Sequence, residues 1–220
     1  MIEQIEIRNL LPCVFAGMED TDRIRSSQIW EEPSFVFHRG CRLCVHAESG
    51  NGKSSLLHFI YGSRKDYKGS ILFDGTDISA LSIAQWCDVR TKGIALLPQD
   101  MALFPELTVG QNIDLKNNMT HHKTSEQIKD LLARLGIDDK HDVAAGKLSI
   151  GQMQRVALVR AVCQPFDFIF LDEPVSHLDA RNNKIVADII TEEANSQGAG
   201  IISTSVGNHL MLDNAKFVSL

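Results

Sequence analysis

A glycine-rich segment at residues 47–54 reads AESGNGKS. It matches the phosphate-loop pattern G-x-x-x-x-G-K-[ST], except that Ala47 stands in place of the first glycine. A glycine turn of this kind points successive backbone N–H groups at phosphate oxygens, while Lys53 would add positive charge and Ser54 a hydroxyl ligand for Mg²⁺. Alanine is acceptable in the first position if its φ angle is not positive. We therefore expect a nucleoside triphosphate site here, the alternative being a turn that only joins a strand to a helix.

Two adjacent carboxylates follow an apolar run that ends at Leu171. Asp172 and Glu173 would lie at the carboxyl end of a strand, where consecutive side chains point to opposite sides. One acid can then serve the Mg²⁺ shell while the other holds an attacking water. Acidic pairs after strands are common, so this pair gains its weight from the phosphate loop about 120 residues upstream.

The elements that must position these motifs can be predicted from apolar patterning. Residues 41–46 predict a strand and residues 54–61 a helix, which places the phosphate loop at a helix N-terminus. Residues 2–10 alternate imperfectly, in the manner of a strand with one wet face. Continuous apolar runs predict further buried strands, at residues 93–97, 168–171 and 200–203.

The residues between the strand at 93–97 and the acidic motif show the apolar spacing of helices instead of strands. Thr124 and Gln127 form a potential capping box, apolar residues follow at helical spacing, and Gly136 can end the helix. We therefore expect an α/β fold, a P-loop NTPase core with a mostly parallel sheet and an inserted helical subdomain. The core would span about residues 1–101 and 165–220, and the insert about 102–164. Residues 16–32 are polar and predict a surface loop.

The order of these motifs resembles that of the ABC ATPase family. Leu148-Ser149-Ile150-Gly151-Gln152 looks like the family's signature L-S-G-G-Q and lies just upstream of the acidic pair. Pro98-Gln99 is similar to its Q-loop, and Ser176-His177-Leu178-Asp179 to its D-loop. The resemblance extends from about residue 2 to residue 220, which is essentially the whole chain. Five motifs in the correct order make it far more specific than any single motif would.

The resemblance implies ATP as the ligand and Mg²⁺ as its metal. In the family, the signature of one chain covers the terminal phosphate held by another, so a homodimer or pseudo-dimer would enclose two ATP molecules. A helix N-terminus with a hydroxyl and exposed amides suits this role, and a simple N-cap function of Ser149 is compatible with it. The implied catalytic residues are Glu173, Gln99 and Ser205, and the implied metal-binding residues are Ser54, Gln99 and Asp172. The implied nucleotide-binding residues are Ala47, Glu48, Ser49, Gly50, Asn51, Gly52, Lys53, Ser54, Ser55, Phe15, Ser149, Gly151 and Gln152.

Two positions depart from the family pattern or match it loosely. Ser205 stands where the family usually has a histidine after the last core strand, and a neutral hydroxyl cannot offer an imidazolium's proton to the terminal phosphate. We therefore expect slow turnover with ATP binding intact, although His209 would substitute if its loop were rearranged. Phe15 is the nearest candidate for stacking on adenine, and a buried core phenylalanine is an equal alternative.

Composition limits the class of protein. The chain has 220 residues with a formal net charge of -6 and no cluster of Lys and Arg, which argues against nucleic acid as a partner. Five cysteines, odd in number and scattered, fit a reducing compartment, and Cys41 and Cys44 are read as small buried residues rather than a metal or redox pair. His121 and His122 lie in a polar segment without further ligands at metal spacing. No segment has the length and apolarity of a membrane span or a leader, so we expect a cytoplasmic protein.

Two functions from different classes fit these features. The first is the motor of a transporter, peripheral on the cytoplasmic face of the inner membrane, whose helical insert contacts a membrane permease subunit close to residues 103–105. The second is a regulatory or assembly module whose output is dimer closure, an alternative suggested by Ser205. A soluble P-loop kinase is a weaker third option, because a kinase has no use for residues 148–152.

Overall fold

A five-stranded parallel sheet forms the centre of the molecule. The computed structural model describes residues 1–18 and 20–220, apart from the side chain of Arg23. The strands run in the order β6-β7-β8-β3-β9, and every pair in this sheet is parallel. The predicted parallel sheet is therefore confirmed, with each predicted strand placed within a residue or two of its expected position. The bounds are β3 Arg42–His46, β6 Ile94–Leu97, β7 Phe168–Asp172, β8 Gly200–Ser205 and β9 Lys216–Ser219.

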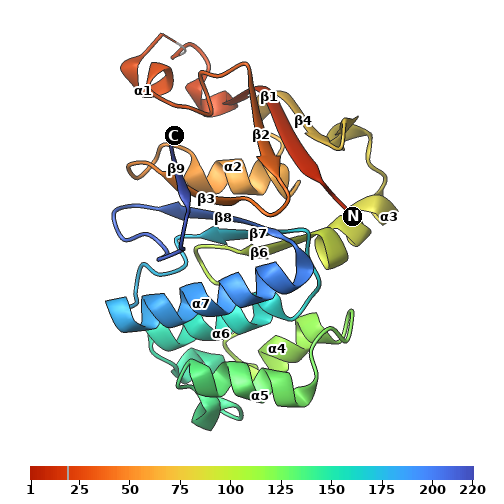
Figure 1. Cartoon of the computed structure of the whole chain (residues 1–220), viewed down its shortest axis with the longest axis vertical. Helices are drawn as coiled ribbons and strands as arrows, with labels where there is room; N and C mark the ends of the chain where they lie inside the picture. Colours follow the sequence, from red (N-terminus) through yellow and green to blue (C-terminus); the bar gives the residue numbers. More distant parts are fainter. Residues whose placement is uncertain (19) are drawn as a thin grey trace.

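A second, antiparallel sheet in the order β2-β1-β4-β5 covers one side of the domain (Figure 1). Only its strand β1 was predicted. The register between β1 and β4 shifts after Arg8, and Gly69 fits there with a φ of +92°, because a Cβ at this position would collide with backbone atoms of Arg8 and Asn9. The bounds are β1 Gln4–Pro12, β2 Ser34–His38, β4 Tyr67–Phe73 and β5 Thr76–Asp77.

Helices fill the space between the sheets and cover the far side of the parallel sheet. Figure 1 shows α2 between the two sheets, α6 and α7 on the opposite face, and α4 and α5 in an outer layer. The predicted capping box at Thr124 and Gln127 starts α5, and Gly136 follows its end with a φ of +62°. The bounds are α1 Asp22–Arg25, α2 Lys53–Ile60, α3 Ile83–Asp88, α4 Val109–Asn117, α5 Ser125–Arg134, α6 Ile150–Val162 and α7 Ala180–Gln197. Short 3₁₀ turns lie at Cys13–Phe15, Ile78–Ala80, Asp138–Lys140 and Ala145–Lys147, and a π turn lies at Val89–Gly93.

The hydrophobic core consists of two clusters, one on each face of the parallel sheet. In β7, Phe168 and Phe170 pack on the side of α2, whereas Ile169 and Leu171 pack on the side of α6 and α7. This division follows from the two-residue alternation of a strand, and a strand buried on both faces has no need of polar positions. The helices α4 and α5 share the second cluster with the sheet, so the expected boundaries of the helical subdomain stay a prediction.

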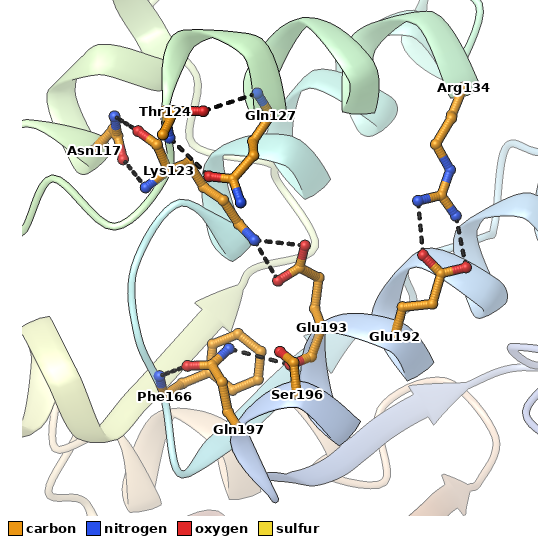
Figure 2. Close-up of polar contacts among 10 residues, drawn as sticks. All are labelled: Asn117, Lys123, Thr124, Gln127, Arg134, Phe166, Glu192, Glu193, Ser196 and Gln197. Atoms are coloured by element: carbon orange, nitrogen blue, oxygen red, sulfur yellow. Dashed lines mark hydrogen bonds and ion pairs between the residues drawn. The ribbon is translucent and has the colours of Figure 1, made fainter.

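Charged contacts attach the helical layer to α7 (Figure 2). The Nζ of Lys123 lies 2.6 and 2.7 Å from the carboxylate oxygens of Glu193, in a pair whose side chains are only 10% and 14% exposed. Arg134 binds both carboxylate oxygens of Glu192, at 2.7 and 2.9 Å. The side-chain amide of Asn117 bonds the N–H and C=O of Lys123 and holds the loop before α5. A bidentate pair and a largely desolvated pair both fix orientation more than a solvated contact does.

The polar segment at residues 16–32 is in part the surface loop that its composition predicts, since most of its described residues are exposed. Ile24, Ile29 and Trp30, however, are 3%, 1% and 6% exposed and join the cluster around α2. Their burial was not predicted because three apolar residues in a polar stretch show neither the strand nor the helix period, although burying each of them is strongly favourable. Hydrogen bonds tie the segment to β9, since Gln28 N–H donates to the Ser219 carbonyl and Ser219 N–H donates to Gln28 Oε1.

The cysteines lie as their scattered positions indicate. All five are free thiols, Cys44 is buried and Cys41 half-buried. Burial raises the pKa of the Cys41 thiol to about 11, so this thiol stays protonated near neutral pH. Within residues 1–18 and 20–220, no group of three or more His, Cys, Asp and Glu side chains could hold a metal by itself. His121 is exposed and His122 half-buried.

Among the described residues, no helix is both long and apolar enough to cross a membrane.

Candidate nucleotide site

The phosphate loop connects β3 to α2, so its backbone amides lead into a helix N-terminus. Gly50 and Gly52 adopt φ angles of +85° and +94°, which only glycine takes without strain. Ala47 is absent from the positive-φ positions of the described chain. Ala47 thus meets the condition stated for alanine in this position, a φ angle that is not positive. That the loop binds phosphate despite the missing first glycine stays a prediction.

Lys53 starts α2 and turns back into the loop. Its Nζ donates to the carbonyl oxygens of Ala47 and Glu48, both at 3.0 Å, and lies 3.9 Å from Glu173 Oε1. Burial lowers the pKa of the Lys53 ammonium, while the charges of Glu173 and Asp172 act in the opposite direction. A poorly solvated cation beside the phosphate loop attracts an anion strongly, because water competes little for either charge.

Asp172 ends β7 and is 2% exposed. Its Oδ1 accepts a 2.6 Å hydrogen bond from Thr204 Oγ1, and the same hydroxyl accepts from Glu173 N–H at 3.1 Å. Its Oδ2 is buried and has no hydrogen-bond partner among the described residues. An orphaned buried carboxylate oxygen is costly unless a cation completes it. Asp172 therefore fits a Mg²⁺ ion, and it lines one cavity with the other two expected metal-binding residues, Ser54 and Gln99.

Glu173 lies one residue beyond the strand, with a φ of +50°. Left-handed backbone at a residue other than glycine is strained, and such strain is concentrated at functional sites. The side chain reaches a pocket of about 180 Å³ that also contains the phosphate loop and Gln99. The lining residues are Pro12, Val14, Phe15, Ser49, Gly50, Gly52, Lys53, Ser54, Ser55, Gln99 and Glu173. Segments from four separate parts of the sequence thus meet at one hollow.

Phe15 lines this pocket but is only 4% exposed and belongs to the core cluster around α2. Phe15 is therefore a core residue that also forms part of the pocket wall. Its stacking on a base stays a prediction. Ser55, at the opposite end of the loop, accepts a 2.8 Å hydrogen bond from Arg64 Nη1 through its hydroxyl.

The signature segment forms the start of α6. Ser149 is the N-cap, its Oγ accepting from Gln152 N–H at 3.3 Å while Gln152 Oε1 accepts from Ser149 N–H at 2.9 Å. Ser149 is exposed, and so is Ile150. A Cβ at Gly151 would lie 3.2 Å from the carbonyl oxygen of His177, so this glycine permits close packing on the D-loop. None of the three implied signature contacts lines the phosphate-loop pocket of its own chain.

Gln154, which sequence reasoning missed, joins the signature helix to the acidic motif. It is 4% exposed, and its Nε2 donates to the Glu173 carbonyl at 3.0 Å and to Ser176 Oγ at 3.3 Å. Its Oε1 accepts from His177 N–H at 3.3 Å. Its sequence neighbours, Met153 and Arg155, give no local signal for this role. Gln154 fixes the strained backbone of Glu173 and the D-loop relative to α6.

Ser205 ends β8 and is 2% exposed. Its Oγ lies 3.6 Å from the Sγ of Cys44 on the neighbouring strand β3. The hydroxyl is therefore directed into the sheet rather than into the pocket with Glu173. His209 is exposed, its ring packs edge-on against Phe217 with a centroid distance of 5.1 Å, and it is not among the residues that line the pocket with Glu173.

The parallel sheet, the glycine loop at a helix N-terminus and the paired carboxylates define a P-loop nucleotide-binding domain. A family model described as "ABC transporter" matches residues 30–176, which is more than half of the chain. The chain therefore belongs to the ABC transporter family and is an ABC-type nucleotide-binding domain.

Individual relatives agree with this assignment. The chain is 30% identical over 173 residues to the ABC transporter ATP-binding protein YtrE of Bacillus subtilis, a match covering 77% of this chain and 75% of YtrE. It is 28% identical over 179 residues to the lipoprotein-releasing system ATP-binding protein LolD of Shewanella denitrificans, covering 80% and 77%. The xylose import ATP-binding protein XylG of Escherichia coli K12 is 35% identical over 153 residues, but the match spans only 29% of XylG.

Solved structures share the fold at low sequence identity. The dimeric bacterial ABC transporter cassette MJ0796 superimposes with a TM-score of 0.73 at 19% identity, covering 98% of this chain and 94% of that one. The ATP-bound structure of a bacterial Atm1-family ABC exporter gives 0.71 at 22% identity, covering 99% and 37%. At these identities the likeness concerns the fold.

Proposed function

We propose that the protein binds and hydrolyses ATP and energises a membrane transporter through nucleotide-dependent dimerisation. The observation that carries this proposal is the pocket in which the phosphate loop, Gln99 and Glu173 meet beside Asp172. The names of YtrE, LolD and XylG, each called an ATP-binding protein of a transport or release system, support the same function. The cargo is expected to be set by the permease, because the motifs described serve the nucleotide and its metal.

The proposed reaction follows from the position of each group. ATP is the substrate, and the amides of the phosphate loop together with Lys53 hold its phosphates. Ser54, Gln99 and Asp172 would hold Mg²⁺, which neutralises charge developing on the phosphate oxygens when bound. Glu173 orients a water and accepts its proton as the water oxygen bonds to the γ-phosphorus and the bond to ADP breaks. Ser149 and Gly151 of a second chain are proposed to cover the γ-phosphate from the other side, with Gln152 fixing their helix turn.

A groove beside the Q-loop suits the membrane partner. It has a volume of about 270 Å³ and is lined by Tyr61, Leu96, Pro98, Ala102, Phe104, Leu115, Lys116, Arg160 and Ala161. Phe104 and Leu115 are 54% and 48% exposed, unusual values for large apolar side chains. We propose that an apolar cytoplasmic segment of a permease docks here, which would hold this protein on the cytoplasmic face of the inner membrane.

The transport function is tested by steady-state ATPase activity with and without the permease in lipid vesicles. We expect stimulation by the permease, and loss of that stimulation in Phe104→Asp with the basal rate unchanged, because a charge in the groove opposes apolar docking. Met119→Asp is the matched control, since Met119 is 58% exposed but does not line the groove. Equal stimulation of both variants would contradict docking at the groove, and no ATPase activity under any condition would contradict the motor.

A regulatory or assembly module with little turnover is the second candidate, and the buried position of Ser205 favours it. We propose that turnover is slow because no imidazole reaches the terminal phosphate from this position. Stable ATP-locked dimers that hydrolyse poorly even with a permease present would support this module rather than the motor.

Restoring a histidine tests this second candidate. Because Ser205 Oγ lies 3.6 Å from Cys44 Sγ, the imidazole needs space, and Cys44→Ala is combined with Ser205→His. We expect the double variant to raise the single-turnover hydrolysis rate by about 100-fold over Cys44→Ala alone, the low end of the range for a positioned proton donor. An unchanged rate in a folded, ATP-binding double variant would show that Ser205 is no handicap.

A further inference from the structure

Trp30 touches the phosphate loop from outside the nucleotide pocket. Its indole Nε1–H donates to the carbonyl oxygen of Asn51 at 3.2 Å. A Cβ built on Gly52 would lie 3.2 Å from the Trp30 ring, so the ring packs directly against the loop. Trp30 itself does not line the pocket. The tryptophan thus contacts the one peptide unit of the loop that joins Asn51 to Gly52.

The geometry of that peptide unit gives the contact a role. In a trans peptide the C=O and the following N–H point in opposite directions within one plane, and the chain has no cis peptide bond in its described part. A donor that holds the Asn51 carbonyl outward therefore turns the Gly52 N–H inward. Gly52 needs this help, because glycine at a φ of +94° has the widest choice of backbone conformations.

Hydrogen bonds hold the segment around Trp30 in place. Ser27 Oγ, in a side chain that is 2% exposed, accepts from Trp30 N–H at 2.8 Å. Gln28 exchanges two hydrogen bonds with Ser219 of β9, at 3.0 and 2.9 Å. β9 pairs in parallel with β3, the strand that leads into the phosphate loop. The segment around Trp30 and the phosphate loop are therefore both attached to the parallel sheet.

We propose that Trp30 is a positioning residue that sets the phosphate loop in its phosphate-binding conformation before ATP arrives. A loop ordered in advance loses less conformational freedom on binding, so affinity for the phosphates rises without any direct contact between Trp30 and the nucleotide. This inference rests on the proposed ATP-binding function, which it extends to the segment at residues 20–32.

The first test compares Trp30→Phe with wild type in the absence of nucleotide. Phenylalanine keeps an aromatic ring at the loop but lacks the indole donor. Hydrogen–deuterium exchange of the amides at residues 50–54 is expected to accelerate about fivefold, the factor that one neutral hydrogen bond is worth. Unchanged exchange in a folded variant would overturn the proposal, and this result does not depend on whether the protein binds ATP.

The second test is calorimetric titration with Mg-ATP. We expect the dissociation constant of Trp30→Phe to rise about fivefold. Trp86→Phe is the matched control, because Trp86 is the only other tryptophan in the sequence and packs against Phe73 and Gly62 away from the loop. Equal dissociation constants in the two variants would contradict the positioning role. Absence of binding in the wild type would contradict the proposed function instead.

A third measurement covers the case in which Trp30→Phe fails to fold. Trp30 is the sole tryptophan of the Trp86→Phe protein, so its fluorescence reports on the contact with Asn51. Because the contact is already formed before ATP arrives, Mg-ATP at a concentration that calorimetry shows to be saturating is expected to leave the Trp30 emission nearly unchanged. A large shift of the emission on binding would mean that the contact forms or breaks with the nucleotide, and it would overturn the proposal.

Discussion

Replacing Glu173 with glutamine is expected to reduce ATP hydrolysis by about 10²- to 10⁴-fold while Mg-ATP binding persists. Glutamine has the same shape but cannot accept a proton from water, and the binding contacts made by Lys53 and the loop amides remain in place. The strained backbone at position 173 also remains supported, because Gln154 bonds the carbonyl there rather than the carboxylate. Single-turnover hydrolysis and calorimetric titration separate the two effects.

The Glu173→Gln experiment has a charge-matched control in Glu106→Gln, which removes an exposed carboxylate outside the pocket. Glu106→Gln is expected to behave as wild type. Wild-type hydrolysis by Glu173→Gln would mean that another group activates the water. Equal losses of binding and hydrolysis would mean that Glu173 mainly shapes the pocket.

Replacing Lys53 with methionine is expected to weaken Mg-ATP binding by about 100-fold, the factor for losing one or two charge-assisted hydrogen bonds. Methionine fills much of the same volume, but it brings neither the positive charge nor the N–H donors that phosphate oxygens need. The loss is large because Lys53 is 5% exposed, so that water offers little compensation for the missing charge.

Calorimetric titration of Lys53→Met against Lys65→Met tests this expectation. Lys65 is exposed and does not line the phosphate-loop pocket, so its variant removes the same charge from the protein without altering the site. Equal affinities in the two variants would remove Lys53 from the binding site. A Lys53→Met protein that unfolds far below the wild-type temperature would instead assign the lysine a structural role between Glu173 and the loop carbonyls.

The parts of the fold that the sequence predicted well are those in which local pattern and tertiary environment agree. The parallel strands are continuous apolar runs because they are buried on both faces, and β7 needs no further information to be recognised. The start of the signature helix was predicted at Ser149, and Ser149 is the N-cap of α6. The phosphate loop was readable because glycine is required at fixed positions with positive φ.

The missed features depend on contacts between distant parts of the chain. The antiparallel sheet escaped prediction because β2, β4 and β5 carry no regular alternation, and the pairing of β2 and β4 with β1 spans up to about 70 residues. Trp30 and Gln154 gave no local signal, since the side chain of each donates its hydrogen bond to a residue 19 or more positions away in the sequence. The direction of the Ser205 side chain was likewise set by Cys44 on a neighbouring strand.

The long helix α7 has a mechanical consequence. Asp179, the last residue of the D-loop, is its N-cap, and the 18 residues from Ala180 to Gln197 lead to the end that carries Glu192 and Glu193. A helix of this length is a stiff rod of about 27 Å. Because ion pairs to Lys123 and Arg134 fasten its far end to the outer helical layer, a displacement at the D-loop would travel along the rod and move α5 with it. We therefore expect α7 to couple movement of the D-loop, at the edge of the proposed ATP pocket, to movement of α5 on the opposite side of the molecule.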